Sequence, residues 1–235
     1  MKFEDLQEPA FAIPYLADRV IDGTLVLFLG AGASAGFGLP GWHEFVNAFL
    51  AEVGIKDVLP PSATADERER ALDRALRKIN HSEPRKLDII RTILYRDRST
   101  PRAKEVFSQH LLIAISSLLV GRKRGHINRV VTFNYDSMLE WFLGIFGLGT
   151  RSICQIPALE GSEDVRIYHP HGYVPHPALR DKNSDFSIVG SLDANGRASN
   201  INKLWWHKEQ DLLRTGVGLF VGLSLATFRD RAVQP

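Results

Sequence analysis

The chain has almost no cysteine, since Cys154 is the only one in 235 residues. A single cysteine cannot form a disulfide within the chain and cannot supply a cysteine-ligated zinc ribbon. Long apolar runs are also missing, because the most apolar helical run, at 111–120, is about half the ~20 residues needed to cross a bilayer. The N-terminus, MKFEDLQEPA, is polar and acidic and lacks the basic-then-apolar order of a secretory signal. We therefore expect a cytoplasmic protein without a membrane partner.

A strong excess of one charge is absent as well. The chain has 29 Lys and Arg against 27 Asp and Glu, which leaves a net charge of +2. A dedicated nucleic-acid-binding protein usually gathers basic residues on one face, whereas the tightest basic cluster here, 122–124, lies between two glycines and indicates a solvated loop. Direct binding of nucleic acid is therefore not expected. With 44% hydrophobic residues, the composition is typical of a globular protein, and we expect a single domain over 1–235.

Short, densely apolar runs predict strands that are buried on both faces, as in a parallel sheet. These runs lie at 24–29, 129–133, 152–156, 165–169 and 217–222. Apolar residues at helical spacing, together with local composition, predict helices at 10–22, 42–53, 136–146 and 203–214. Strands interspersed with helices in this way predict the α/β class, with a Rossmann-like, doubly wound parallel sheet.

Residues 55–122 contain no strand pattern. They form either an all-helical insertion or the helical layer over a sheet, and we interpret them as an all-helical insertion within the domain. Expected helices in this block lie at 65–79, at 85–96 and, as one long helix, at 103–119. The polar, Pro- and Gly-containing segment 174–200 is expected to be a loop that leaves room for one edge strand at 186–190.

Small or polar clusters follow directly after four of the predicted strands. They are GAGAS at 30–34, NYD at 134–136, HG at 171–172 and SL at 224–225. Open α/β sheets bind ligands beyond the carboxyl ends of their strands. Four clusters in such positions therefore predict a shared crevice.

The glycine-rich turn after the first strand suggests a close approach to the backbone. Gly30, Gly32 and Ala35 fit a G-x-G-x-x-A spacing, in which backbone N–H groups surround a pyrophosphate. A tight strand-to-helix turn without a ligand is the alternative. A dehydrogenase is disfavoured, because the acidic residue that should end a second strand about 20 positions later is replaced by the helical pattern at 43–58.

The second and third clusters carry candidate catalytic side chains. Asn134 and Asp136 fall on one side of an extended chain end, and capping of the following helix is the alternative for both. His169 and His171 alternate onto one face, but no carboxylates can be placed beside them, so a metal site is not expected. Gly172 leaves the backbone beside His171 open, which suits a histidine that projects into a pocket as a general base.

Taken together, the clusters resemble the sirtuin family, and more closely its bacterial sirtuin-like branch found in antiphage defence. The resemblance implies that Asn134 holds the ribose or the attacking water, that Asp136 contacts the nicotinamide amide, and that His171 is the catalytic histidine. The residues that it implies for binding the rest of NAD are Gly30, Ala31, Gly32, Ser34, Gly222, Ser224 and Leu225.

Two departures from the protein-deacylating sirtuins shape the expected activity. Those enzymes carry a four-cysteine zinc ribbon, which this chain cannot build, and an acidic, aromatic and arginine run. That run is GWHEF here, with Trp42 in place of the aromatic residue and no arginine. The defence branch lacks the ribbon and cleaves free NAD, so the resemblance implies an NAD hydrolase that uses NAD as its substrate without a metal.

The resemblance also implies control of that activity, because uncontrolled cleavage would drain the NAD of the cell. We expect a homo-oligomer and a regulatory partner protein or domain. The chain stops ten residues after Leu225, so it is expected to be a fragment of a longer protein or a short effector. Two alternatives are an NAD-dependent protein deacylase and a non-catalytic module that binds NAD or ADP-ribose.

Overall fold

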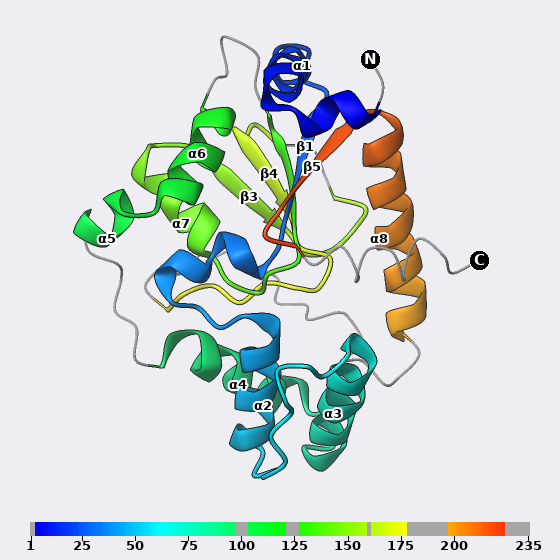
Figure 1. The fold of residues 1–235 in the computed structure, drawn as a ribbon. Coiled ribbons are helices and arrows are strands. Elements are labelled where there is room, and N and C mark those ends of the chain that lie inside the picture. The colour runs from blue at the N-terminus through cyan, green and yellow to red at the C-terminus, as the bar shows by residue number, and fades with distance from the viewer. Residues whose placement is uncertain (1–2, 97–102, 121–126, 159–160, 178–196, 224–235) are drawn as a thin grey trace.

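A five-stranded parallel sheet forms the centre of the computed structural model (Figure 1), in the strand order β3-β4-β2-β1-β5. The described residues are 3–96, 103–120, 127–158, 161–177 and 197–223. The strands are β1 (Leu25–Leu29), β2 (Arg129–Thr132), β3 (Thr150–Ile153), β4 (Val165–Tyr168) and β5 (Val217–Val221). Four lie where strands are predicted, and β3 begins two residues before the strand predicted at 152–156 and ends at Ile153. The predicted α/β, Rossmann-like sheet is confirmed.

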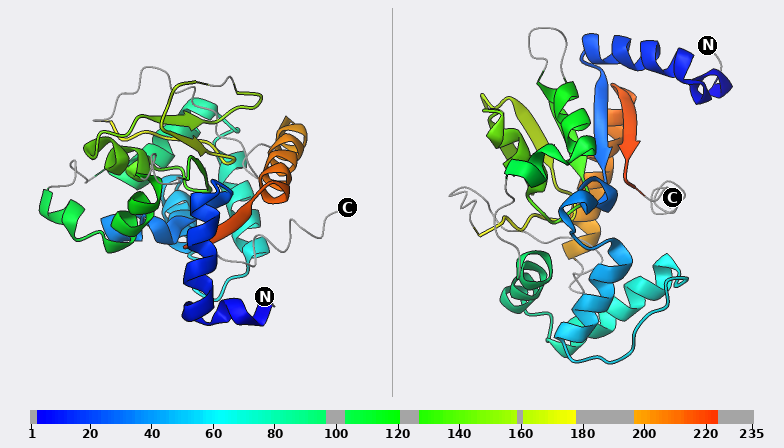
Figure 2. Two further views of the ribbon diagram at one scale, coloured as in Figure 1. Left: turned by 90° about the horizontal axis from the view of Figure 1, so that it is seen from above. Right: turned by 60° about the vertical axis from the view of Figure 1, so that its left-hand side comes forward.

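Helices cover both faces of this sheet, which makes it doubly wound (Figure 2). One face packs against α1 (Pro9–Ile21), α6 (His110–Leu119) and α7 (Met138–Ile145), and the other against α8 (Arg197–Arg214). Every residue of β1 is buried, and alternate side chains enter opposite layers: Leu27 joins the first face and Phe28 the second. A continuous apolar run is therefore what a strand between two helical layers requires.

A helical lobe lies beyond the carboxyl edge of the sheet, below it in Figure 1. It consists of α2 (Trp42–Glu52), α3 (Ala65–Lys78) and α4 (Glu83–Tyr95), which share one apolar cluster. Further short helices are η1 (Phe3–Gln7), η2 (Ala31–Ala33), η3 (Ala35–Phe37) and α5 (Ala103–Phe107). The block at 55–122 thus contributes in two ways, because α3 and α4 build the lobe whereas α6 packs on the sheet.

The single long helix predicted at 103–119 is wrong, because α5 and α6 are separate. The Ser108 hydroxyl donates to the Glu105 carbonyl at 2.7 Å, and Gln109 leaves the helical conformation with φ −84° and ψ 66°. The Gln109 side chain instead donates to the carbonyl of Gly36 at 2.9 Å. The break therefore ties the helical layer to the loop that follows β1.

The predicted loop at 174–200 is too long at its end, because α8 already begins at Arg197. The edge strand considered at 186–190 and the basic cluster at 122–124 lie outside the described residues.

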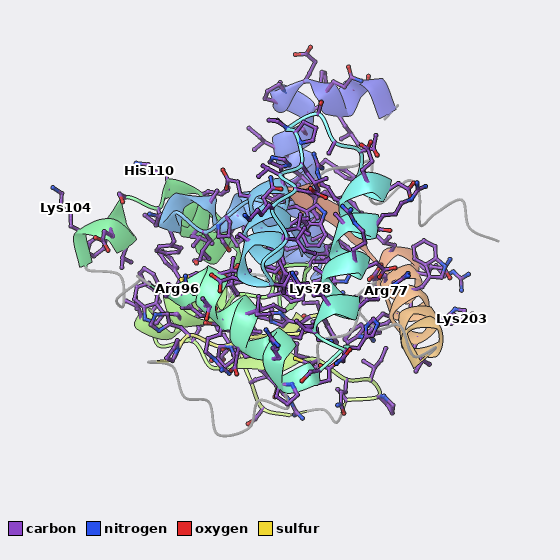
Figure 3. All side chains as sticks on the ribbon, turned by 90° about the horizontal axis from the view of Figure 1, so that it is seen from below. Arg77, Lys78, Arg96, Lys104, His110 and Lys203 are labelled. Atoms are coloured by element: carbon purple, nitrogen blue, oxygen red, sulfur yellow. The ribbon has the colours of Figure 1, made fainter. Side chains whose placement is uncertain are left out.

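Basic side chains on the face seen in Figure 3 come from several separate elements. Arg77 of α3 pairs with Asp73 at 3.7 Å, and Arg96, just after α4, pairs with Glu52 at 2.9 Å. Lys203 lies on α8, on the opposite side of this view from the α5 helix. Exposed pairs of this kind contribute little stability, about 0–1 kcal/mol each. Their main effect is to balance charge locally on the outer surface.

Candidate functional site

The loops after β1, β2, β4 and β5 begin at the same edge of the sheet. Leu29 is level with Thr132 of β2 and with Val221 of β5, and Val131 is level with Tyr168 of β4. From β1 the chain goes to β2 and then to the edge strand β3, turns back to β4 between them, and finally crosses to β5 on the other side of β1. This reversal at β1 is the position at which open α/β sheets bind ligands.

The loop after β1 is glycine-rich because another backbone segment lies against it. A Cβ on Gly30 would lie 2.5 Å from the Gly222 carbonyl oxygen, and one on Gly32 would lie 2.8 Å from the Gly222 Cα. Gly222 has a φ of +66°, and a Cβ there would lie 2.7 Å from the Ala33 nitrogen. The close packing of the loop after β5 is therefore one reason why Gly30 and Gly32 carry no side chain.

Several amides of the glycine loop already donate hydrogen bonds within the protein. Those of Gly30, Gly32, Ala33 and Ser34 each donate to a backbone carbonyl, at 2.8 to 3.1 Å. Two 3₁₀ turns, η2 and η3, follow β1, and the first α-helix begins only at Trp42. These four amides are therefore satisfied within the protein, and contact between the loop and a cofactor stays a prediction.

Asn134 follows β2, and its side chain reaches the glycine loop. Its Nδ2 donates to the Gly30 carbonyl at 3.0 Å and to Ser34 Oγ at 3.2 Å. Because a carbonyl oxygen can only accept, the bond to Gly30 fixes which end of the amide is the nitrogen. Both N–H groups are used in this way, and Oδ1 remains to accept a hydrogen bond. The observed bonds of this side chain therefore serve the loop and not the cap of α7.

Asp136 does contribute to the start of α7, and it also bonds to the glycine loop. Its Oδ1 accepts from the Met138 amide at 3.0 Å and from Ser34 Oγ at 3.0 Å. Ser34 is predicted to face the cofactor, but its hydroxyl here joins Asn134 to Asp136 inside the protein. The pKa of Asp136 is raised to about 6: burial is the largest cause, the bond from Met138 opposes it, Glu140 adds to the rise, and the bond from Ser34 also opposes it.

His171 lies in a tight turn directly after β4. The Gly172 amide donates to the His169 carbonyl at 3.0 Å, and Pro170 occupies the second position of this turn, where a fixed φ is favourable. The partly buried His171 ring packs against Phe133, with 5.4 Å between ring centroids. Since Phe133 directly follows β2, the turn brings His171 beside the loop that carries the other candidate side chains.

The late loop is described only in part. Gly222 packs against Gly32, whereas Ser224 and Leu225 lie outside the described residues. Of the three residues predicted to bind NAD in this loop, only Gly222 is among the described residues, and its contact with NAD stays a prediction.

Glu140, a buried carboxylate behind this edge, is not among the site residues predicted from the sequence. It is the only charged residue of the otherwise apolar α7, MLEWFLGI. Its Oε1 lies 2.7 Å from His169 Nε2 and accepts from Ser152 Oγ at 2.9 Å. A lone acidic residue in an apolar helix could have signalled this pair, because a buried carboxylate needs a partner. His169, considered above together with His171, instead bonds to Glu140.

A pocket of about 370 Å³ adjoins this buried carboxylate. Its lining consists of Glu140, Trp141, Gly144, Ile145, Thr150, Ser152 and Tyr173. None of the site residues predicted from the sequence lines this pocket, so it is distinct from the predicted crevice. Over the residues that the structure describes, no group of three His, Cys, Asp or Glu could hold a metal ion.

The fold and the site together define an α/β protein with a hydrogen-bonded polar cluster at the carboxyl edge of its sheet. No family model matches the chain, and no curated protein matches it either. The likeness to sirtuins is therefore carried by the motifs alone. Among the helices in the described ranges, none has the length and apolarity needed to cross a membrane.

Proposed function

We propose that the protein hydrolyses NAD to nicotinamide and ADP-ribose, as an effector of antiphage defence by abortive infection. The observation that supports the proposal most is that Asn134 and Asp136 bond to the glycine loop at the switch point of a parallel sheet, while His171 packs beside the loop that carries them both. These residue types in this chain order are those that the sirtuin resemblance implies. Homo-oligomerisation and a regulatory partner are part of the same proposal.

The reaction cleaves an N-glycosidic bond through an oxocarbenium-like centre at the anomeric carbon of the ribose. The bonding electrons leave with the nicotinamide, which departs neutral, so no strong general acid is needed. Water adds to the anomeric carbon and loses one proton. The protein therefore has to orient the ribose and the water, and to accept that proton.

Each candidate side chain offers a group suited to one of these tasks. Asn134 has Oδ1 left as an acceptor, so it can orient the O–H of water or of a ribose hydroxyl. Asp136 uses Oδ1 within the protein, and its other oxygen can accept from the nicotinamide amide. His171 takes the proton from water and passes it to solvent.

The decisive experiment follows nicotinamide release from NAD alone, at low and at high protein concentration. The His171→Ala variant should fold and bind NAD, while its kcat falls by roughly 10²–10⁴-fold, because a positioned general base contributes about that much. His207→Ala removes an exposed histidine from α8 and serves as the matched control, with unchanged turnover expected.

Three outcomes would contradict the proposal in different ways. Equal turnover by wild type and folded His171→Ala would remove His171 from the mechanism. Strict dependence on an acyl-lysine peptide would favour a deacylase. Tight NAD binding by the assembled protein without any release of nicotinamide would favour a binding module.

A further inference from the structure

The ring of His169 is held by a hydrogen bond at each of its nitrogens. Nδ1 lies 3.2 Å from the Asn134 carbonyl oxygen, and Nε2 lies 2.7 Å from Glu140 Oε1. His169 is fully buried and Glu140 is 8% exposed. A buried ring therefore connects α7 to the backbone of the residue proposed to orient the nucleophile.

The partners of the ring determine where its protons are. The Asn134 carbonyl can only accept, so Nδ1 of His169 must carry a hydrogen. The contact between Nε2 and Glu140 then contains one more proton, which sits either on the ring or on the carboxyl group. The pair is neutral overall in both cases, and in both cases Nδ1–H donates to Asn134.

Two further side chains contact the pair. Ser152 Oγ donates to the same Glu140 oxygen at 2.9 Å, and the Tyr173 ring lies 4.7 Å from the His169 ring between centroids. On the Asn134 side of the contact, the backbone N–H of Asn134 donates to Thr132 Oγ1 at 3.3 Å. The bond from His169 therefore fixes the backbone carbonyl of Asn134, while other bonds fix its backbone N–H and its side chain.

We infer, resting on the NAD cleavage proposed above, that Glu140 and His169 are positioning residues for that reaction. Glu140 holds the His169 ring so that its Nδ1–H donates to the backbone carbonyl of Asn134. The bond from Nδ1–H fixes the peptide group next to the Cα that carries the Asn134 side chain. The direction of Oδ1, the free acceptor of Asn134, depends on that peptide. Neither positioning residue touches the reacting atoms; both act through Asn134.

Two substitutions of Glu140 separate positioning from simple filling of space. Glu140→Gln keeps a donor for the neutral ring, so Nδ1–H stays on Asn134, whereas Glu140→Leu fills similar space with no polar group. We expect Glu140→Leu to lower kcat roughly 10–100-fold, since a displaced positioning group can cost that much, with KM for NAD changed less than about threefold. Glu140→Gln should retain kcat within about threefold.

Ser152→Ala is the matched control, because it removes a hydrogen bond from the same carboxylate oxygen but leaves His169 in place. Its kcat should stay within about threefold of wild type. Equal kcat in Glu140→Leu and wild type would overturn the inference. Equally low kcat in Glu140→Gln and Glu140→Leu would also overturn it, because hydrogen-bonded positioning predicts rescue by Gln.

A second measurement does not depend on turnover. ¹⁵N NMR of the wild-type imidazole, assigned by the signals missing from His169→Gln, should show Nδ1 protonated. A neutral ring protonated only at Nε2 would overturn the inference, because its Nδ1 could not donate to Asn134. If wild type releases no nicotinamide, the proposed function fails while this measurement still decides the positioning geometry.

Discussion

Gly32 and Gly222 lie against each other where the loops after β1 and β5 meet. The Cα of Gly222 would be 2.8 Å from a Cβ on Gly32, a distance that real structures do not tolerate. Gly36, four residues further along, is different, because a Cβ there would meet only the end of the Gln109 side chain. A backbone cannot move aside as cheaply as the end of a long side chain can.

Gly32→Val should therefore force the two loops apart and weaken NAD binding. Overpacking of this kind typically costs about 1–3 kcal/mol of stability, and the displaced loops no longer form the same crevice. Gly144→Ala, in α7, is the matched control, because a Cβ there would have nothing within 4 Å, and it should bind NAD like wild type and lose no stability. Calorimetric titration with NAD and urea unfolding measure the two effects. Wild-type NAD affinity in Gly32→Val would move the binding site away from this loop.

The sequence indicates which candidate residues follow the strands, but not which of them bond to one another. Asn134 and Asp136 could be singled out because they directly follow an apolar strand. The bond from Ser34 to Asp136, however, joins positions 102 apart in sequence. That contact depends on how β1 and β2 are paired in register, which local sequence patterns do not contain.

Tyr95, the last residue of α4, connects the helical lobe to two loops of the site. Its hydroxyl donates to the Val174 carbonyl at 2.7 Å and accepts from the Ser137 amide at 3.1 Å. Its ring also meets His176 edge-on, at 5.0 Å between centroids. Burial raises the pKa of Tyr95, so the hydroxyl stays protonated and continues to donate.

Tyr95→Phe should destabilise the protein by about 1–3 kcal/mol, because it leaves a buried carbonyl and a buried amide without their partner. Tyr15→Phe on α1 is the matched control, since the Tyr15 ring contacts Arg19 through its face and should keep that contact. Urea unfolding of both variants gives the comparison. Equal unfolding midpoints for Tyr95→Phe and wild type would mean that the lobe is held to the site by apolar packing alone.

At the scale of elements, prediction worked where the deciding signal was local. Four of the five strands contain short apolar runs that mark them in the sequence, whereas β3, TRSI, is mostly polar and its predicted run lies further along the chain. The break between α5 and α6 depends instead on Gln109 reaching Gly36, 73 residues earlier. An apolar pattern continues through Ser108 and Gln109, so periodicity predicts one helix where the tertiary contact favours two.

The molecule as a whole has one apolar core in the sheet with its helical layers and another in the helical lobe (Figure 2). The candidate site lies where the sheet and the lobe meet. Met138 and Val174 follow β2 and β4 in sequence, yet they pack into the lobe's cluster. Asp136 is 7% exposed at this junction. Removing a carboxylate from water costs free energy, and its two hydrogen bonds at Oδ1 offset only part of that cost.

This cost makes the stability of the whole protein depend on pH in a defined direction. The pKa of Asp136 rises from an ordinary 3.8 to about 6, mainly through burial. Between those values the unfolded chain has released the proton while the folded protein still holds it, so stability falls as pH rises. The contribution of Asp136 is fully present below about pH 3.8 and is lost as pH rises through about 6, by an amount on the order of 3 kcal/mol.

Asp136→Asn isolates this effect, because the amide oxygen can accept the same bonds from Ser34 and Met138 but does not ionise over this range. Urea unfolding of wild type and variant is measured at about pH 4 and at about pH 7.5. At each pH the difference between the two free energies of unfolding is taken, so that the contributions of the other titrating groups cancel. Wild type should lose stability relative to the variant at the higher pH, by roughly 2–2.5 kcal/mol, because part of the full effect already lies below pH 4. A relative gain would mean that the fold stabilises the Asp136 carboxylate, contrary to its burial.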